Sequence, residues 1–202
     1  MTAGSDIPRR GVLAGAGLLI ASPALAAGKP RVAIQTSHGV IVVELETTKA
    51  PVTSANFLRY VDTGKYNGGM FYRAARTPGV TGAGTIQGGP SPTARHFPPI
   101  AHESTKMTGL RHKAGTISMT RNEPGSATSD FFICASPEPY LDARPGASGD
   151  NLGFAAFGQV VQGMEVVRKI LALHTSRTAI VPAMKGQMLD PPVPIVSMTR
   201  KA

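Results

Sequence analysis

The sequence predicts a mainly β domain with two helices, and three features of the chain support this prediction. Its 23 glycines and 17 prolines, with no tryptophan, are typical of a protein rich in turns and loops. Short runs of β-branched and aromatic residues recur along the chain, separated by Gly, Pro, Ser and Asn. Two other stretches carry apolar residues at helical spacing. The 202 residues suffice for one closed hydrophobic core.

Residues 1–27 are predicted to be an export signal rather than part of the domain. Arg9 and Arg10 precede an uncharged, mostly apolar run over residues 11–25, and an Ala-Leu-Ala sequence for cleavage ends it. The run is too short to span a membrane comfortably, so no membrane anchor is expected after signal removal. The paired arginines fit the twin-arginine pattern; an ordinary secretory signal is the alternative. We therefore expect a periplasmic protein with residues 28–202 as its mature domain.

The first part of the domain is predicted to be a β-hairpin followed by a helix. Residues 32–36 and 40–45 are β-rich runs, and the Ser-His-Gly sequence between them is typical of a hairpin turn. A proline in the first turn, apolar residues at helical spacing and Gly64 at the end predict a helix over about residues 52–63. The next strand carries Phe-Tyr-Arg at 71–73, where the arginine must either reach solvent or line a cleft.

The chain is organised around residues 115–142. Two short apolar runs, at 116–119 and 131–134, flank a polar loop over residues 120–130. A loop held between buried strands is a common way for a rigid scaffold to present binding residues. Cys134 lies in the second run and, as the one cysteine of the chain, cannot form an internal disulfide. We expect it to be a buried strand residue rather than a reactive thiol.

The C-terminal part is predicted to contain a strand, an amphipathic helix and a final strand. Residues 153–161 are a β-type run. The helix is expected over residues 164–171, with its Lys and Arg in the C-terminal half, where they complement the helix dipole. The last strand is expected at residues 191–198, after a proline-rich start.

The charge and the histidines do not indicate nucleic-acid or metal binding. The formal charge is +9 at pH 7, but the basic residues are scattered and no aromatic residues alternate with them for base stacking. His96, His102 and His112 are irregularly spaced and have no cysteine partner, so no metal site is expected. A nucleophilic serine is not expected either, because the chain has no Gly-x-Ser-x-Gly motif.

Five short motifs occur in order along the chain. They are A-P-x-T-x-x-N-F at residues 50–57, F-Y-R at 71–73, I-Q-G-G at 86–89, F-F-I at 131–133 and G-M-x-V-V at 163–167. In this order and spacing they resemble the cyclophilin family of peptidyl-prolyl isomerases, and the similarity extends from Arg31 to Met198. The resemblance implies an eight-stranded antiparallel barrel with a helix closing each end. The local patterns alone support only a β-rich domain with two helices.

The resemblance implies an enzyme that accelerates isomerisation of Xaa-Pro amide bonds in protein folding. Conjugation sets the barrier at about 18–20 kcal/mol, and at the twisted transition state the nitrogen carries a localised lone pair. A fixed cationic donor near that nitrogen binds the transition state better than either planar state. By resemblance, Arg73 is this donor, Gln87 binds substrate backbone beside it, and Phe132 is the floor of the proline pocket. This chemistry needs no metal or other cofactor, and none is expected.

By the same resemblance, further residues are expected to bind the peptide. Met119, Thr120 and Arg121 stand where an edge strand of the family offers its backbone to the substrate. The expected walls of the pocket are Tyr72, Asp130, Tyr140, Leu141 and Phe154. Four of these differ from the usual family residues. Tyr72 and Phe154 stand where the family usually has histidine, and Asp130 stands where it has glutamine. Tyr140 replaces a tryptophan that is associated with cyclosporin binding.

One departure leaves two functions open. Gly84 and Thr85 stand where the family has a Phe-Met pair of the pocket, which predicts a looser grip on proline. The first function is an exported, monomeric isomerase that acts on proline-containing segments of unfolded or flexible proteins. The alternative is a binding module or chaperone that holds such segments with weak or no turnover. Arg73 and Phe132 favour the enzyme, because the rate depends mainly on the electrostatic donor.

Overall fold

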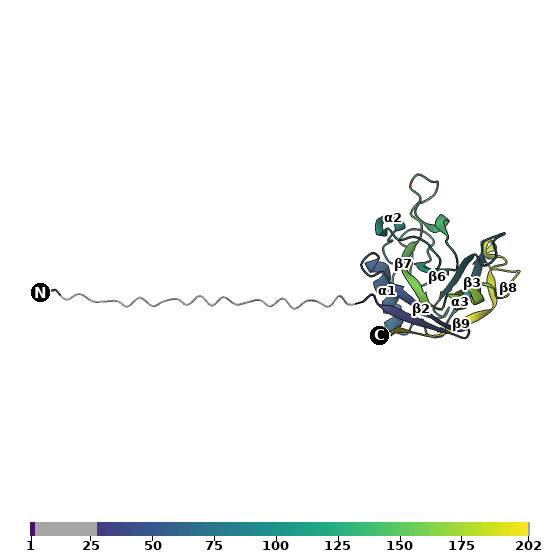
Figure 1. Ribbon diagram of the computed structural model, residues 1–202, viewed down its shortest axis with the longest axis horizontal. Helices are drawn as coiled ribbons and strands as arrows, with labels where there is room; N and C mark the ends of the chain where they lie inside the picture. Colours follow the sequence, from purple (N-terminus) through teal and green to yellow (C-terminus); the bar gives the residue numbers. More distant parts are fainter. Residues whose placement is uncertain (3–27, 202) are drawn as a thin grey trace.

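The computed structural model describes residues 1–2 and 28–201 (Figure 1). The predicted export signal, residues 1–27, lies outside this part of the chain apart from its first two residues. The barrel begins with strand β1 at Arg31 and its last strand ends at Lys201. None of the helices described is long and apolar enough to cross a membrane.

Eight antiparallel strands form a closed barrel, which confirms the predicted fold class. They follow one another around the barrel in the order β1-β2-β7-β5-β6-β4-β3-β9, and pairing of β9 with β1 closes it. A short strand, β8 (Thr175–Ser176), pairs only with β9. The barrel strands are β1 (Arg31–Thr36), β2 (Gly39–Leu45), β3 (Gly69–Arg76), β4 (Gly84–Gly89), β5 (Thr116–Met119), β6 (Phe131–Cys134), β7 (Ala155–Gln162) and β9 (Met188–Lys201).

Two helices pack against the barrel from different sides (Figure 1). Helix α1 (Pro51–Asp62) begins with the proline of the first motif, and the Glu103 carboxylate accepts hydrogen bonds from the first free backbone N–H groups of the helix. Helix α3 (Met164–Leu171) buries its apolar face against β2, β3 and β4. The remaining turns of helix are α2 (Thr105–Thr108), η1 (Pro139–Leu141) and η2 (Pro182–Met184).

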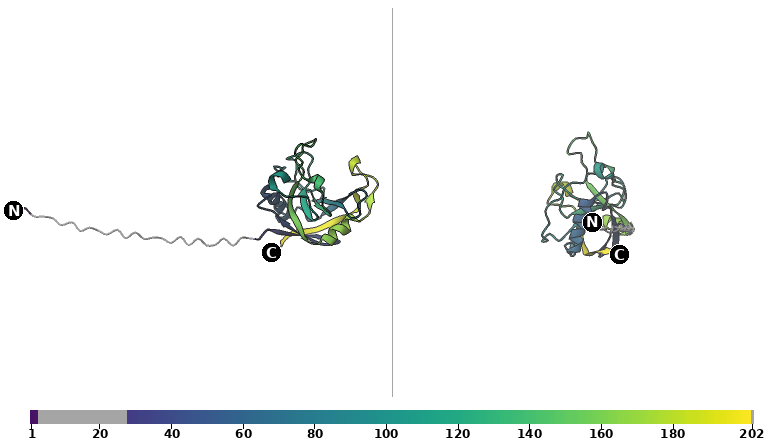
Figure 2. Two further views of the ribbon diagram at one scale, coloured as in Figure 1. Left: turned by 45° about the horizontal axis from the view of Figure 1, so that its top comes forward. Right: turned by 90° about the vertical axis from the view of Figure 1, so that its left-hand side faces the viewer.

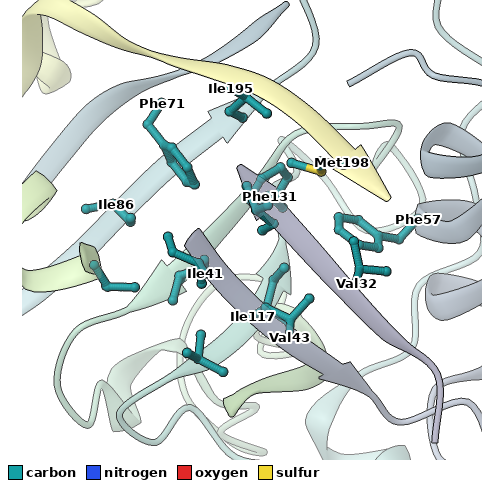
Figure 3. Close-up of a cluster of buried hydrophobic side chains, with 14 of the residues drawn as sticks. Val32, Ile41, Val43, Phe57, Phe71, Ile86, Ile117, Phe131, Ile195 and Met198 are labelled. Atoms are coloured by element: carbon teal, nitrogen blue, oxygen red, sulfur yellow. The ribbon is translucent and has the colours of Figure 1, made fainter. Parts of the chain in front are cut away.

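The barrel interior is filled mainly by branched aliphatic and aromatic side chains from the eight barrel strands. Figure 3 shows part of this core. Phe57 of α1 meets Phe131 of β6 edge to face, with ring centroids 5.6 Å apart. Tyr66 also packs on Phe131, and its hydroxyl donates a hydrogen bond to the Ser129 carbonyl oxygen. Cys134 is fully buried, as predicted, and burial raises the pKa of its thiol. The packed interior makes the barrel a rigid support for the loops at its mouth.

Two groups of residues rise from the barrel on different sides of its mouth (Figure 2). One consists of the loops that follow β5 and η1, within residues 120–154. The other is the segment between α3 and β9, residues 172–187, which contains β8 and η2.

The expectation of an edge strand is wrong for Met119, the last residue of β5. Strand β5 pairs with β6 on one side and β7 on the other, so the closed barrel leaves its backbone no free edge. Met119 lies opposite Phe131 and Ala155, and its side chain is 1% exposed and belongs to the core. A bound peptide therefore cannot extend the sheet at β5.

Candidate active site

A cavity of about 650 Å³ opens beside strands β3, β4 and β6. Side chains from several separate segments of the chain line it. Of the eleven residues expected in the site, ten line this cavity, and Met119 does not. The ten are Tyr72, Arg73, Gln87, Thr120, Arg121, Asp130, Phe132, Tyr140, Leu141 and Phe154.

A β-bulge in β3 explains how two consecutive side chains reach the cavity. Phe71 pairs with Gly88 and Arg73 with Gln87, so Tyr72 has no partner of its own on β4. An extra residue in one strand re-aims the side chains around it. Phe71 is fully buried in the core, whereas Tyr72 and Arg73 both line the cavity. The Phe-Tyr-Arg order, unusual for a regular strand, is therefore the sequence of a bulge.

The glycines of the I-Q-G-G motif allow the close approach of neighbouring elements. A Cβ on Gly88 would lie 2.8 Å from the Met70 carbonyl oxygen and 2.9 Å from the Phe71 ring. A Cβ on Gly89 would overlap the Asp130 carboxylate. The second glycine thus provides the space in which Asp130 reaches the cavity wall.

Arg73 is held by two amide side chains. Its Nη1 donates to Gln87 Oε1 at 2.9 Å, while Nε and Nη2 donate to Gln187 Oε1 at 2.8 and 2.6 Å. Arg73 forms no ion pair with any residue that the structure describes. Partial burial lowers the pKa of its guanidinium from the usual value, as expected for a cation that has lost part of its hydration. The result is a fixed cation whose charge is not neutralised.

A chain of hydrogen bonds fixes the orientation of Gln87. The Tyr72 hydroxyl donates to Asp130 Oδ2 at 2.7 Å and accepts from Gln87 Nε2 at 2.7 Å. Because a carboxylate only accepts, the direction of both bonds is set, and Gln87 must turn Oε1 toward Arg73. Burial, and next the charge of Asp130, raise the pKa of Tyr72 and keep its hydroxyl protonated. The two departures at Tyr72 and Asp130 therefore form one hydrogen-bonded pair.

The apolar part of the cavity is built on Phe132. This side chain is only 5% exposed and meets the Phe154 ring edge to face, with centroids 5.5 Å apart. Leu141 lines the same region, and Tyr140 lies at the rim, where it is 55% exposed. A small pocket with an aromatic floor and an open rim suits a compact apolar ring.

Arg121, on the opposite wall, is neutralised. Its two terminal nitrogens each lie 2.8 Å from an oxygen of Asp150, and it also donates to the Gly153 carbonyl oxygen. The guanidinium lies 5.2 Å from the centre of the Phe154 ring. Thr120 next to it donates its backbone N–H to the Asp130 carbonyl oxygen at 2.9 Å. Both residues therefore line the cavity from fixed positions.

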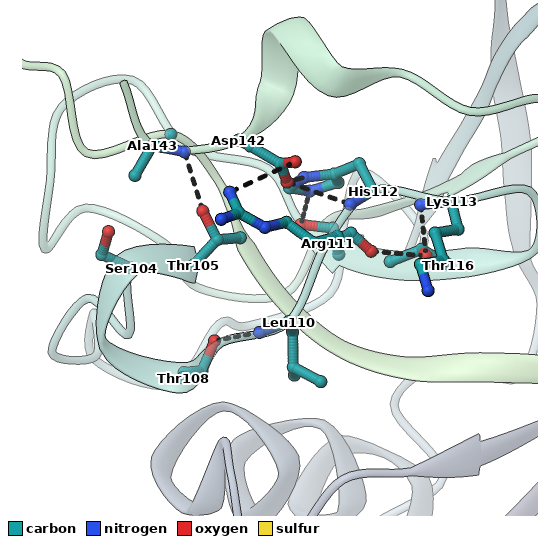
Figure 4. Close-up of polar contacts among 12 residues, drawn as sticks. Ser104, Thr105, Thr108, Leu110, Arg111, His112, Lys113, Thr116, Asp142 and Ala143 are labelled. Atoms are coloured by element: carbon teal, nitrogen blue, oxygen red, sulfur yellow. Dashed lines mark hydrogen bonds and ion pairs between the residues drawn. The ribbon is translucent and has the colours of Figure 1, made fainter. Parts of the chain in front are cut away.

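A buried Ser-His-Asp arrangement supports the Phe132 ring from behind, and the sequence did not predict it (Figure 4 shows its His112–Asp142 part). His112 stacks on Phe132 with centroids 5.7 Å apart and ring planes at 17°. Its Nδ1 lies 2.7 Å from Asp142 Oδ1 and its Nε2 lies 3.0 Å from Ser118 Oγ. Burial lowers the pKa of His112, although Asp142 opposes this effect. Ser118 is fully buried, so no substrate reaches it and the arrangement is structural.

Two residues that the sequence did not predict, one lining the cavity and one binding Arg73, come from the segment before β9. Met184 lines the cavity, and Gln187 binds Arg73. They follow Arg73 by more than a hundred positions in the chain and belong to no recognised motif. Gly84 is buried and Thr85 lines the cavity, so the side of β4 contributes little apolar volume.

The site residues include no group arranged like a metal centre. Among the residues that the structure describes, no three His, Cys, Asp or Glu side chains lie together as ion ligands. His96 instead contacts the Ser129 hydroxyl, with Nδ1 at 2.8 Å.

Comparison with known proteins gives a consistent assignment. A family model described as "Cyclophilin type peptidyl-prolyl cis-trans isomerase/CLD" matches residues 31–200. Peptidyl-prolyl cis-trans isomerase A of Dickeya dadantii is 40% identical over 156 residues, which cover 76% of this chain and 78% of that protein. A peptidyl-prolyl cis-trans isomerase of Acinetobacter baylyi is 37% identical over 191 residues and covers 92% of both chains.

Solved structures agree on the fold. A cyclophilin-type isomerase of Cryptosporidium parvum superimposes with a TM-score of 0.61 at 21% identity, covering 86% of this chain and 98% of that one. The same protein crystallised in the presence of the dipeptide Ala-Pro gives a TM-score of 0.59 at 22% identity, with coverage of 85% and 99%. The closed barrel and the extent of the sequence similarity lead to one conclusion: this chain belongs to the cyclophilin family of peptidyl-prolyl cis-trans isomerases.

Proposed function

We propose that Arg73 catalyses the cis-trans isomerisation of Xaa-Pro bonds in unfolded or flexible protein segments. The observation that carries this proposal is the fixing of the Arg73 guanidinium by two neutral amide oxygens, at a cavity whose apolar floor is Phe132. A cation held in this way is oriented before the substrate arrives and keeps its charge for the reacting amide.

The guanidinium acts on the state in which the amide is twisted. There the nitrogen lone pair is no longer conjugated with the carbonyl group and can accept a hydrogen bond, which it cannot do in either planar state. An N–H of Arg73 directed at this lone pair therefore stabilises the transition state selectively. A stabilisation of about 6 kcal/mol corresponds to a rate increase of roughly 10⁴.

The rest of the cavity binds the substrate on both sides of the amide bond that rotates. We assign the proline ring to the apolar pocket formed by Phe132, Leu141 and Phe154, where the ring is shielded from water. Gln87 uses one N–H for Tyr72 and has a second N–H with which to bind a substrate carbonyl group. The Cryptosporidium protein was crystallised in the presence of the dipeptide Ala-Pro, which contains an amide bond of this kind.

We further propose that the protein acts as a monomer on exported proteins in the periplasm. The basis is the sequence of residues 1–27, with Arg9 and Arg10 before an apolar run and an Ala-Leu-Ala end. Mass spectrometry of the protein from the cell envelope should find an N-terminus near Ala27 or Gly28. A cytosolic protein that retains Met1 contradicts this proposal.

The proposed activity can be measured by exchange NMR on an Xaa-Pro peptide. Wild-type protein at substoichiometric concentration should broaden and exchange the cis and trans signals, and Arg73→Ala should abolish most of this exchange. The second candidate, a binding module with little turnover, is favoured by the small side chains at Gly84 and Thr85. It predicts that the peptide signals shift on binding while the exchange rate stays at its uncatalysed value.

A further inference from the structure

The segment between α3 and β9 lies directly beside the candidate catalytic arginine. The backbone N–H of Ala74 donates to the Gln187 carbonyl oxygen at 2.8 Å, and Arg73 pairs with Met188 in the β3–β9 register. The N–H of Gln187 in turn donates to the Met184 carbonyl oxygen at 3.0 Å. The end of the segment is therefore fixed to the strand that carries Arg73.

Gln187 makes more hydrogen bonds to Arg73 than any other side chain. It accepts from both Nε and Nη2 through one oxygen, at 2.8 and 2.6 Å. Its own Nε2 faces the Ala183 carbonyl oxygen at 3.3 Å, so the amide is oriented with Oε1 toward the guanidinium. This leaves Nη1 for Gln87, and the plane of the guanidinium is fixed from two sides.

Met184 provides the large apolar side chain on this side of the cavity. The neighbouring lining residues from β3 and β4, Ala75 and Thr85, are small. Gly84 cannot be enlarged without overlap, because its φ is +132° and a Cβ there would overlap the Ala75 carbonyl oxygen. The unbranched thioether of Met184 can adapt to ligands of different shape.

We propose that residues 184–187 form a functional part of the active site. In this segment Gln187 positions Arg73, and Met184 contacts the bound peptide. This inference rests on the proposed catalytic function of Arg73 and adds two residues to it. Gln187 is a positioning residue, because it acts only through Arg73. Met184 is a binding residue that selects for apolar groups next to the proline.

The proposed role of Gln187 requires that its side chain is neutral. A carboxylate at position 187 would hold the guanidinium at least as firmly as the amide does, but it would neutralise the charge needed at the twisted amide. A purely structural role and a positioning role for Gln187 therefore predict different turnover for Gln187→Glu. A structural role predicts equal or higher stability with unchanged turnover, and the proposed role predicts equal or higher stability with slower turnover.

The test compares Gln187→Ala and Gln187→Glu with wild type and with Arg73→Ala. Exchange NMR on an Ala-Pro peptide gives kcat and KM, thermal unfolding reports stability, and the ¹⁵Nε signal of Arg73 reports its contact. Both Gln187 variants should lower kcat about tenfold with KM changed less than twofold. Gln35→Ala, an exposed glutamine on β1, is the matched control and should leave every readout unchanged.

The outcomes separate this inference from the proposed function. If wild type is no faster than Arg73→Ala, the proposed function fails, and this inference fails with it. If Arg73→Ala is slow while Gln187→Glu turns over at the wild-type rate, the positioning role alone is wrong. Wild-type kcat in Gln187→Ala, with an unchanged Arg73 ¹⁵Nε signal, overturns it equally.

Met184 is tested by affinity rather than rate. Met184→Ala should raise KM about three- to tenfold for peptides with an apolar residue beside the proline, with little change for peptides with glycine there. Met184→Leu, which keeps the apolar volume, should restore most of the affinity. Met107→Ala, at a methionine that is 76% exposed on α2, is the control. Equal KM values for Met184→Ala and wild type on both peptides would overturn the assignment.

Discussion

Two arginines line the same cavity, and their partners are of opposite kinds. Arg73 is bound by the neutral oxygens of Gln87 and Gln187, whereas Arg121 is bound by both carboxylate oxygens of Asp150. Both are fixed in place, but only Arg73 keeps a charge that is not compensated within the described residues. Amide oxygens can therefore fix the position of a guanidinium in a cavity without neutralising its charge, whereas carboxylates neutralise it.

The largest effect should come from removing the free charge. Arg73→Ala is expected to lower kcat roughly a hundredfold, which corresponds to about 3 kcal/mol of lost transition-state stabilisation. Peptide affinity should fall much less, because the charge acts mostly on the twisted state. Arg73→Lys should recover only part of the rate, since an ammonium group lacks the planar fork of donors.

Exchange NMR measures this rate, and thermal unfolding is the control. The Arg73 variants should unfold near the wild-type temperature, because the side chain is half-buried and, among the residues described, forms hydrogen bonds with just two other side chains. Unchanged turnover in a folded Arg73→Ala protein would favour the binding module. A protein that unfolds would indicate that Arg73 is a structural arginine.

A tenfold loss of kcat/KM is expected when the hydrogen bonds that link Asp130 to Arg73 through Tyr72 and Gln87 are broken. The Tyr72 hydroxyl and the Gln87 amide lie between this carboxylate and the guanidinium. Tyr72→Phe frees Gln87 to turn and removes the hydrogen bond to Asp130 Oδ2, so kcat/KM should fall about tenfold. Asp130→Asn combined with Tyr72→Phe should lose less than the sum of the single variants, because the two residues act as a pair. Fully additive losses in kcat/KM would contradict the pairing.

A smaller effect is expected at the neutralised arginine. Arg121→Ala removes hydrogen bonds to the Gly153 carbonyl oxygen and the contact with Phe154, which should raise KM about threefold and destabilise the fold by about 1–2 kcal/mol. The value of kcat should change less than twofold. Saturation kinetics and thermal unfolding measure the two effects, and a fall in kcat as large as that of Arg73→Ala would remove the contrast between the two arginines.

The smallest expected effect is a change in the pKa of Asp150. Hydrogen bonding to Arg121, and then to the Leu152 N–H, lowers the pKa of Asp150 from 3.8 to about 2. Because the folded pKa is the lower one, the pair stabilises the protein above about pH 4, and this contribution is lost as the pH falls toward 2. NMR titration of the Asp150 carboxyl group should give a midpoint near 2 in wild type and one closer to 3.8 in Arg121→Gln. Identical midpoints would indicate that Arg121 does not set the titration.

The sequence was sufficient for the barrel because the relevant signals are local. Runs of β-branched and aromatic residues, glycine turns and a proline-led helix each depend on neighbouring residues, and the order of the motifs along the chain matched a known family. The same motifs predicted Arg73, Gln87 and Phe132, which lie in or next to the paired strands β3, β4 and β6. Their catalytic roles remain predictions that the experiments above address.

The sequence was not sufficient to predict contacts between residues that are distant along the chain, or features that depend on closure of the barrel. It gave no signal for Gln187 or Met184, because a loop side chain acquires its partner only when β9 pairs with β3. It placed Met119 in an edge strand, because whether a strand has a neighbour on both sides is a property of the whole barrel. The buried contact of His112 with Ser118 was missed for a related reason: no motif spacing marks a hydrogen bond that faces the core.

Closure of the barrel has a consequence for a protein that is proposed to act on unfolded chains. Every barrel strand has a neighbouring strand on both sides, since β9 returns to β1. Unfolded segments rich in β-branched residues readily add to any free strand, and such addition starts aggregation. The ring offers them no such template. An isomerase of this shape can release each client after rotation instead of being incorporated into its aggregates.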